Sequence, residues 1–223
     1  MKMKYIIMCG GNYRAWEKPR QLLPFLGEPI VARTIRLLRE NGIEDISISS
    51  NKPGFDCFGV PVINHYNSYD AASYNKSKGN WCDAFFFSDD PTCYLFGDVV
   101  FSENAIRKIV QYETDDVMLF GSSPPFSKEY PKRWIEPFAF KAQDMDHLYR
   151  AVEDVKRLDK AGRFNRRPIA WEVWNVVSRG PDGDVNTIDC SSYKAINDWT
   201  CDIDKPSEIP LLERIASQKH DCD

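Results

Sequence analysis

The segment KYIIMCGGNYRAWEKPRQLLPF at residues 4–25 joins an apolar run, a glycine pair and a short polar loop. The apolar run predicts a buried strand, because a run of this length bounded by glycine is typical of a central strand. Gly10 and Gly11 allow the backbone to turn tightly and to approach a ligand closely. Three cationic side chains follow at once, which indicates a site for an anionic group: Arg14, Lys18 and Arg20.

The composition is that of an ordinary α/β protein of one domain. The chain has 223 residues, and its hydrophobic fraction of 43% is enough for a sizeable core. The net charge of −4 argues against a nucleic-acid-binding or membrane-surface protein, because both usually carry a basic excess. There is no long apolar run and no signal-peptide pattern at the start, so we expect a cytoplasmic protein without a membrane partner.

The seven cysteines show no metal-ligand spacing. None forms a CxxC pair and their number is odd, so we expect reduced thiols in a cytosolic setting. The three histidines lie far apart in the sequence, which disfavours a zinc site.

Strands and helices alternate along most of the chain, which predicts right-handed βαβ units and a mostly parallel sheet flanked by helices. After the first strand we expect strands at 46–49, 60–63, 92–96, 117–120, 134–140 and 195–203. The expected helices cover 29–41, 102–112, a stretch that begins at Asp144, and 206–217. Residues 64–80 are polar and aromatic without periodicity, and such long irregular segments are more often functional than accidental.

The glycine turn matches neither of two well-known phosphate-binding patterns. The chain contains no GxGxxG and no GxxxxGK[ST]. A strand, a glycine turn and a helix nevertheless form the general geometry of phosphate binding in α/β proteins. A tight turn without any ligand is the alternative for the glycine pair alone.

Acidic residues stand where strands are expected to end. Asp98 follows a buried strand and Gly97, so its carboxylate is expected to face the crevice of an open sheet, although turn capping is an alternative. Asp202 and Asp204 alternate along an extended segment and can point to one face. Asp204 can instead cap the final helix.

Two further groups are left with open alternatives. The segment 171–174, with Trp171 and Glu172, can line a pocket for an acceptor or bury a dimer seam, and it equally suits a plain core. The arginines at 163, 166 and 167 can hold a phosphate or form a solvated basic loop.

Three ordered stretches resemble a known superfamily. CGGNYRAWEKPRQLLPFLGEPIVARTIRLLRENGIEDISIS at 9–49 is similar to the opening of the nucleotidyltransferases with a glycosyltransferase-A-like fold, whose signature loop resembles LxxGxGxR…PKxL. YLFGDVVFS at 94–102 and WTCDIDKPSEIPLLERI at 199–215 resemble later segments of the same proteins. Phosphocholine cytidylyltransferases resemble the chain most, in length and in GEPIVARTIRLLRENGI. Asn12 and Tyr13 replace a glycine-containing pair, and Arg20 stands where the family usually has lysine.

The resemblance implies a fold of the nucleotide-diphospho-sugar transferase type, which is Rossmann-like. It implies one domain over residues 1–223, with the nucleotide-binding part at about 1–115 and the acceptor-binding and metal-binding part at about 116–223. It also implies Mg²⁺ as cofactor, with Asp98 and Asp204 as ligands and Asp202 as the alternative to Asp204.

The remaining site residues follow from the same resemblance. Catalytic roles fall to Arg20, Arg14 and Asp98. The nucleotide would be bound by Cys9, Gly10, Gly11, Asn12, Arg14 and Arg20. Relatives place acceptor-binding residues in the irregular segment, so the acceptor would contact Asn64, Tyr66 and Asn67, with Trp171 and Glu172 as further candidates.

The implied reaction transfers a nucleoside monophosphate from a nucleoside triphosphate, CTP being favoured, to a small phosphorylated metabolite. Pyrophosphate leaves, and the activated product would serve surface (capsule) polysaccharide synthesis. The attacking phosphate is already anionic, so positioning and cations suffice and no general base is needed. Two alternatives remain: a glycosyltransferase that uses a nucleotide sugar, and a catalytically weak nucleotide-binding regulatory protein. A homodimer is compatible with the implied transferase.

Overall fold

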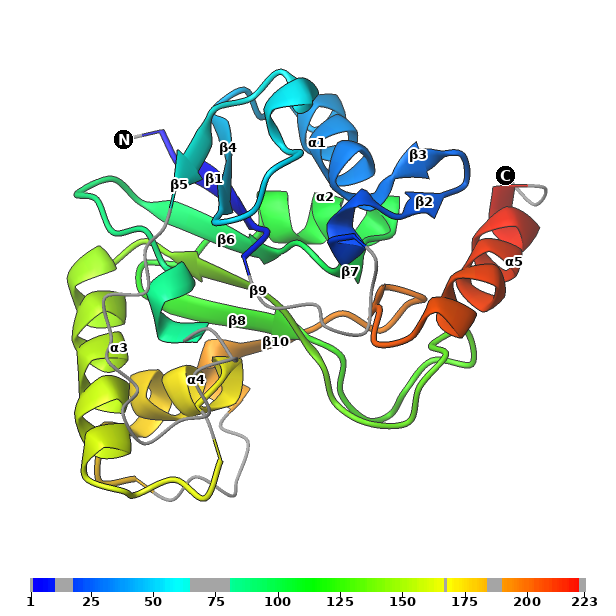
Figure 1. Cartoon of the computed structure of the whole chain (residues 1–223). Helices are drawn as coiled ribbons and strands as arrows, with labels where there is room; N and C mark the ends of the chain where they lie inside the picture. The colour runs from blue at the N-terminus through cyan, green and yellow to red at the C-terminus, as the bar shows by residue number, and fades with distance from the viewer. Residues whose placement is uncertain (1, 11–17, 65–80, 167, 184–189, 221–223) are drawn as a thin grey trace.

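A seven-stranded mixed sheet forms the centre of the molecule (Figure 1). The computed structural model describes residues 2–10, 18–64, 81–166, 168–183 and 190–220. The strand order is β10-β8-β9-β6-β1-β4-β5. The strands are β1 (Lys4–Met8), β4 (Ile46–Ser50), β5 (Val62–Asn64), β6 (Thr92–Phe96), β8 (Val117–Gly121), β9 (Pro137–Ala142) and β10 (Tyr193–Ala195). All neighbouring pairs are parallel except the two that β9 makes with β6 and β8. The sheet is therefore mostly parallel, as the sequence predicts.

Helices flank the sheet. They are α1 (Ile30–Glu40), α2 (Glu103–Gln111), α3 (Met145–Lys160), α4 (Ala170–Arg179) and α5 (Ile209–His220). Helices α1 and α2 contact each other, as do α3 and α4. Helix α5 stands apart, on the side of the molecule that also carries a small hairpin (Figure 1). None of the described helices combines the length and apolar character that crossing a bilayer requires.

Two short strand pairs lie outside the main sheet. Strands β2 (Pro24–Phe25) and β3 (Glu28–Pro29) form the hairpin, and β7 (Val99–Val100) pairs antiparallel with β11 (Cys201–Asp202). Single turns of 3₁₀ helix complete the elements: η1 (Arg20–Leu22), η2 (Asp56–Phe58), η3 (Trp81–Ala84), η4 (Cys190–Ser192) and η5 (Pro206–Glu208). The β7–β11 pair brings two segments about a hundred residues apart into contact.

The local causes of the helix starts agree with the sequence patterns. The Ser102 hydroxyl accepts the backbone N–H of Ala105 at 2.9 Å and caps α2. The Asp144 carboxylate accepts the N–H of His147 at 2.8 Å and caps α3. Both caps are where the sequence predicts them.

Two expectations about elements are wrong. The strand expected over 195–203 is two short strands in different sheets, β10 and β11, because the intervening turn is fixed by Asp198. Its carboxylate accepts the N–H of Thr200 at 2.8 Å and the Ser102 hydroxyl at 2.7 Å. The strand expected at 134–140 begins later, at Pro137, and extends to Ala142. Helix α4 was not expected at all.

Candidate functional site

The carboxyl ends of β1 and β6 meet at one edge of the sheet, and the candidate site begins there. Met8 is paired with Phe96, and the Gly97 N–H donates to the Met8 carbonyl at 3.0 Å. A Cβ atom at Gly97 would lie 2.7 Å from that carbonyl oxygen and 2.7 Å from the Cys9 sulfur. Glycine is therefore required here, and it holds Asp98 beside the end of the first strand.

Arg20 links three separate segments of the chain. Its Nη2 lies 2.6 Å from Asp98 Oδ2, and its Nη1 lies 3.7 Å from Asp204 Oδ1. Nη1 also donates to the carbonyl of Ile203. The side chain is only 19% exposed, whereas the Asp204 side chain is 49% exposed, so this contact lies at the rim of the site.

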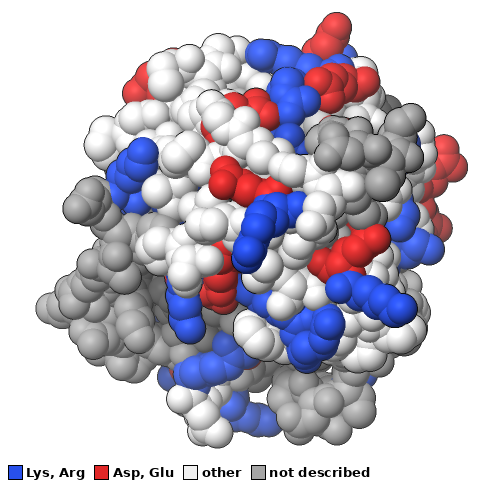
Figure 2. All heavy atoms as spheres, turned by 90° about the vertical axis from the view of Figure 1, so that its right-hand side faces the viewer, with Lys and Arg blue, Asp and Glu red and all other residues white. Residues whose placement is uncertain are grey.

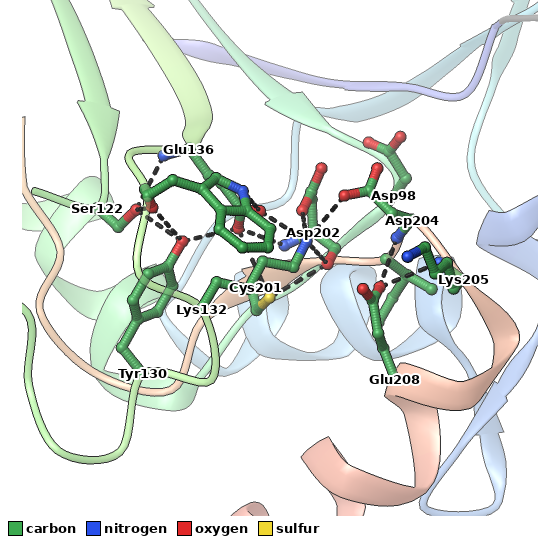
Figure 3. A network of polar contacts seen from close by, with 12 residues as sticks. Asp98, Ser122, Tyr130, Lys132, Glu136, Cys201, Asp202, Asp204, Lys205 and Glu208 are labelled. Atoms are coloured by element: carbon green, nitrogen blue, oxygen red, sulfur yellow. Dashed lines mark hydrogen bonds and ion pairs between the residues drawn. The ribbon is translucent and has the colours of Figure 1, made fainter.

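Asp98 and Asp204 are brought together by the antiparallel β7–β11 pair. Asp202 pairs with Val99, and the Ile203 N–H donates to the Asp98 carbonyl at 2.9 Å. The two residues therefore meet through a ladder outside the seven-stranded sheet and not through neighbouring parallel strands. Figure 3 shows the carboxylates of Asp98, Asp202 and Asp204 gathered in one region.

A second cation lies deeper in the same cluster. Lys132 is 5% exposed, and its ammonium is 2.6 Å from Glu136 Oε1 and 3.0 Å from Asp204 Oδ2. It also contacts Asp202 Oδ1 and the Asp202 carbonyl, the latter at 3.1 Å (Figure 3). Lys132 thus joins the segment before β9 to both acidic residues of the β11 region.

Glu136 is the most deeply buried carboxylate of this cluster, with 4% of its side chain exposed. Its Oε2 accepts the Tyr130 hydroxyl at 2.8 Å, and its Oε1 accepts the Trp134 indole N–H at 3.0 Å. Together with Cys201 and Asp202 it forms a group whose ligand atoms lie within 4.8 Å of one another. Burial raises the pKa of the Cys201 thiol, and the charge of Glu136 adds to this effect.

Burial also raises the pKa of Asp202, to about 9. A hydrogen bond to Glu136 and the negative charges of Glu136 and Asp98 act in the same direction, and the Lys132 ammonium opposes them. Burial is the largest single influence on the pKa of Lys132 and lowers it, but the charge of Asp202, the neighbouring Cys201 and the hydrogen bonds to Asp202 and Glu136 together outweigh burial, and the net shift is upward. The ammonium therefore stays charged, and the cluster retains an excess of negative charge.

The donor set fits a divalent cation that prefers oxygen. Four carboxylates face two cations, Arg20 and Lys132, in one connected network. With its pKa of about 9, Asp202 is protonated at neutral pH, so three charged carboxylates face the two cations and the cluster stays net negative. Carboxylate oxygens are the protein ligands that Mg²⁺ prefers. Of the candidate ligands, Asp204 is the most exposed, with 49% of its side chain accessible, whereas Asp98 and Asp202 are 26% and 25% exposed.

Several expected nucleotide-binding residues lie at or beside this edge. Gly10 follows β1, and Cys9 is fully buried with its N–H donating to the Ser49 carbonyl at 2.7 Å, so its side chain belongs to the core. Gly11, Asn12 and Arg14 lie outside the described residues. Their roles stay predictions.

The candidate acceptor residues are distributed differently. Asn64 ends β5 and is exposed, and Tyr66 and Asn67 lie outside the described residues. Trp171 and Glu172 are on α4, beside β10 and α3 (Figure 1). Their assignment to the acceptor is not tested by this arrangement.

The observed contacts of Trp171 and Glu172 stabilise α4 and its packing against neighbouring elements. Glu172 Oε2 accepts the Ile169 N–H at 2.8 Å, and Oε1 is 2.8 Å from Arg166. Trp171 stacks on Tyr193 with ring centroids 6.5 Å apart. Glu172, the third residue of α4, therefore caps the start of this helix.

Lys132 and Glu136 were not predicted from the sequence. They lie in the loosely matching middle of the chain, in YPKRWIEPF at 130–138. A lysine and a glutamate four residues apart inside an aromatic run are the available signal, because charges in such a run are buried only when they are paired.

The cysteines behave as expected in the part of the chain that the structure describes. The five cysteines whose side chains the structure describes are free thiols; Cys57 is exposed, and Cys9, Cys82, Cys93 and Cys201 are buried. Cys201 borders the acidic cluster, and burial with the charge of Glu136 raises its thiol pKa, so it is present as the thiol.

No model of a known protein family and no curated protein matches the sequence. Solved structures do match. A protein from Bacillus anthracis provisionally assigned as a glucose-1-phosphate thymidylyltransferase, in complex with sucrose, has a TM-score of 0.59 at 17% identity, covering 96% of this chain and 95% of its own. The CTP:phosphocholine cytidylyltransferase of Streptococcus pneumoniae has a TM-score of 0.57 at 16% identity, with 96% and 99% covered.

A third match is the inositol-1-phosphate CTP transferase of T. maritima, with a TM-score of 0.52 at 14% identity and 96% of each chain covered. These likenesses extend over nearly the whole chain. They show that the chain has the nucleotidyltransferase-like fold that its sequence resembles, with the mostly parallel sheet and flanking helices expected for it.

Proposed function

We propose that the chain transfers a nucleoside monophosphate, preferably CMP from CTP, to a small phosphorylated acceptor with release of pyrophosphate. The observation that carries this proposal is the connected cluster of Arg20, Lys132 and four carboxylates at the carboxyl edge of the sheet. Ligands of open α/β sheets bind at this edge. The fold neighbours include two enzymes whose names specify CTP.

The chain's own residues have separate roles in the proposed reaction. Arg20, and Arg14 six residues before it in the sequence, would bind the triphosphate and hold its α-phosphorus in line with the acceptor oxygen. Arginine suits this task because its planar guanidinium can grip two phosphate oxygens. The acceptor phosphate is itself anionic, so this site needs no group to remove a proton.

Asp98 and Asp204 would hold Mg²⁺, with Asp202 as the alternative to Asp204. When bound, the ion supplies positive charge that offsets the repulsion between the two phosphorylated reactants. Lys132 and Glu136 would keep the Asp202–Asp204 segment in place, because the ammonium contacts all three carboxylates.

The acceptor is proposed to be a small metabolite and not a nucleic acid. The names of the fold neighbours specify glucose 1-phosphate, phosphocholine and inositol 1-phosphate. On the face shown in Figure 2, basic and acidic side chains are interspersed, whereas nucleic-acid binding needs an extended basic surface. The product would be an activated precursor for surface polysaccharide, made in the cytoplasm where nucleoside triphosphates are present.

The base is identified by thermal-shift measurements with CTP, UTP, dTTP, GTP and ATP, each with Mg²⁺. A ligand that binds the folded state raises the melting temperature, and we expect the largest increase with CTP. Pyrophosphate release is then measured with CTP and phosphocholine, inositol 1-phosphate or glucose 1-phosphate. Release that needs one of these acceptors supports the proposal. A nucleotide sugar that is consumed without pyrophosphate would identify a glycosyltransferase instead.

The metal ligands are tested with Asp98→Asn, Asp204→Asn and the double variant. Either single substitution should lower turnover by several orders of magnitude, and the double variant should lose little more, because the ligands act as a unit. Asp115→Asn, a change at an exposed residue near the other end of the sheet, is the control and should keep full turnover. Full activity of Asp204→Asn together with a large loss in Asp202→Asn would assign the second ligand to Asp202.

A further inference from the structure

Arg20 occupies the position between the two carboxylates that the proposed function assigns to the metal. Its Nη2 lies 2.6 Å from Asp98 Oδ2 and its Nη1 lies 3.7 Å from Asp204 Oδ1. A cation that bound both residues through these oxygens would lie where the guanidinium lies. The two cations therefore cannot bind there at the same time.

The two resident cations differ in how easily they can leave. Lys132 and Glu136 have side chains that are 5% and 4% exposed, so removing the lysine would leave buried carboxylates without a counter-charge. Arg20 is 19% exposed, and its partners Asp98 and Asp204 are 26% and 49% exposed. Water can replace the guanidinium at these two residues at a much smaller cost. Arg20 is the exchangeable cation, and Lys132 is the permanent one.

Triphosphate gives Arg20 an alternative partner. Guanidinium binds phosphate oxygens in the same bidentate manner as it binds carboxylates. A guanidinium that moves from Asp98 and Asp204 to a phosphate uncovers both carboxylates in the same step. The site has then lost the positive charge of Arg20, while Lys132 stays in contact with Asp204, and a metal can bind there more tightly.

We propose that Arg20 is an internal counter-ion that closes the metal site until a triphosphate draws it away, so that metal and triphosphate bind cooperatively and the metal alone binds weakly. This inference rests on the proposed function for the identity of the two ligands. A residue that only contacted phosphate would affect triphosphate binding alone. The counter-ion role instead assigns Arg20 opposite effects on the binding of triphosphate and on the binding of metal. Loss of Arg20 should weaken triphosphate binding and strengthen metal binding.

The test is the affinity of Mn²⁺, measured by electron paramagnetic resonance in the absence of nucleotide, for the wild type and Arg20→Met. We expect Mn²⁺ to bind the variant at least about tenfold more tightly, because the competing cation and its repulsion are gone. The gain should disappear in Arg20→Met combined with Asp98→Asn. Lys205→Met, which removes an exposed positive charge next to Asp204, is the matched control and should change the Mn²⁺ affinity much less.

Inorganic tripolyphosphate provides the second measurement. It should raise the Mn²⁺ affinity of the wild type more than that of Arg20→Met, because the coupling between two ligands is reciprocal and passes through this residue. If Arg20→Met does not fold, Arg20→Lys replaces it. The expected gain in Mn²⁺ affinity is then smaller, because lysine lacks the planar guanidinium but still carries a positive charge.

Equal or weaker Mn²⁺ binding to the Arg20 variant would overturn the inference, as would Mn²⁺ binding to neither protein. Neither readout involves turnover. Pyrophosphate release by the wild type with an unchanged Mn²⁺ affinity in Arg20→Met would therefore refute the counter-ion role and leave the transferase function standing. Tighter Mn²⁺ binding to Arg20→Met, together with no pyrophosphate release by the wild type, would support the counter-ion role and refute the transferase function.

Discussion

At the scale of single residues, Lys132 is the cation on which the acidic cluster depends. Its ammonium is within ion-pair distance of Glu136, Asp202 and Asp204, and only 5% of the side chain is exposed. Its contact with Glu136 lies in the interior, where unpaired charge is costly, and its contact with Asp204 reaches the solvent. One residue thus couples the core to the rim of the site.

We predict that Lys132→Met lowers the free energy of unfolding by about 3–5 kcal/mol, the cost of leaving one member of a buried ion pair without its partner. The measurement is urea denaturation at neutral pH. Lys194→Met, at an exposed lysine that lies over the Tyr112 ring, is the control and should cost less than about 1 kcal/mol. Lys132→Met combined with Glu136→Gln should recover part of the loss, and no recovery would indicate that packing of the lysine stem dominates.

Buried thiols predict a loss of stability at alkaline pH. Burial raises the pKa of Cys93 to about 12, whereas an unfolded cysteine has a pKa of about 8.5. Between these values the unfolded chain releases the proton and the folded chain keeps it, so rising pH favours unfolding. The free energy of unfolding should fall by about 1.4 kcal/mol per pH unit for this thiol.

The measurement is the difference between the wild type and Cys93→Ala from pH 9 to 11. The free energy of unfolding of Cys93→Ala should fall less steeply with pH than that of the wild type, by about 1.4 kcal/mol per pH unit. This difference in slope does not depend on the stability of the variant at neutral pH. Burial also raises the pKa of Cys82 to about 12, and the Lys156 charge opposes it, so Cys82→Ala should have a similar effect and the double variant a larger one. Parallel curves for all four proteins would show that these thiols titrate alike in the folded and unfolded states.

At the scale of elements, the decisive contact is the close approach of the β6–β7 turn to the end of β1. Gly97 has no room for a side chain, because a Cβ atom would lie 2.7 Å from the Met8 carbonyl and 3.0 Å from the Gln21 Cγ atom. Asp98 is the next residue, and Arg20 precedes Gln21. The turn therefore sets the distance between Asp98 and Arg20.

We predict that Gly97→Ala costs about 1–3 kcal/mol of stability by overpacking and also weakens the binding of CTP with Mg²⁺. Denaturation and thermal shift give the two readouts. Cys9→Ala combined with Gly97→Ala should restore only part of the stability, since the carbonyl of Met8 remains in the way. Unchanged nucleotide binding in the single variant would show that the turn does not position the site.

The elements predictable from sequence are those with strong local signals. The helix starts at Ser102 and Asp144 were predictable because a capping side chain precedes a regular apolar pattern. The break between β10 and β11 was not, because it depends on Asp198 bonding to Thr200 and Ser102, and Ser102 is 96 residues away. Helix α4 was missed because WEVWNVV consists mostly of aromatic and β-branched residues, which favour strands.

The residues of the candidate site also divide into those that local sequence signals could suggest and those that they could not. Arg20, Asp98 and Asp204 stand beside glycine turns or strand ends, so the sequence could suggest them, and the structure brings them into one cluster. Lys132 and Glu136 enter that cluster through tertiary packing alone, with Asp202 about 70 residues further along the chain. No local pattern indicates which buried charges will meet over that distance.

At the scale of the whole molecule, the two halves of the chain share one sheet. Strand β6 pairs with β1 on one side and with β9 on the other, so it joins the segments that the sequence assigns to nucleotide and acceptor binding. The β7–β11 ladder and the ion pair between Arg20 and Asp204 cross between the same halves. The candidate site therefore lies where the two halves of the chain meet.

We predict that residues 1–223 unfold as one cooperative unit. Breaking the β6–β9 ladder would expose buried residues of both halves at once, including Leu95 and Phe140, so neither half has a core that is independent of the other. Calorimetry should give one transition whose van't Hoff and calorimetric enthalpies agree, with an enthalpy of about 160 kcal/mol for a chain of this length. CTP with Mg²⁺ should move that whole transition to higher temperature, because the proposed site takes residues from both halves and exists only when they are folded together. Two transitions, of which CTP shifts only one, would instead show that the nucleotide-binding part is a separate domain and that Asp204 belongs to the other.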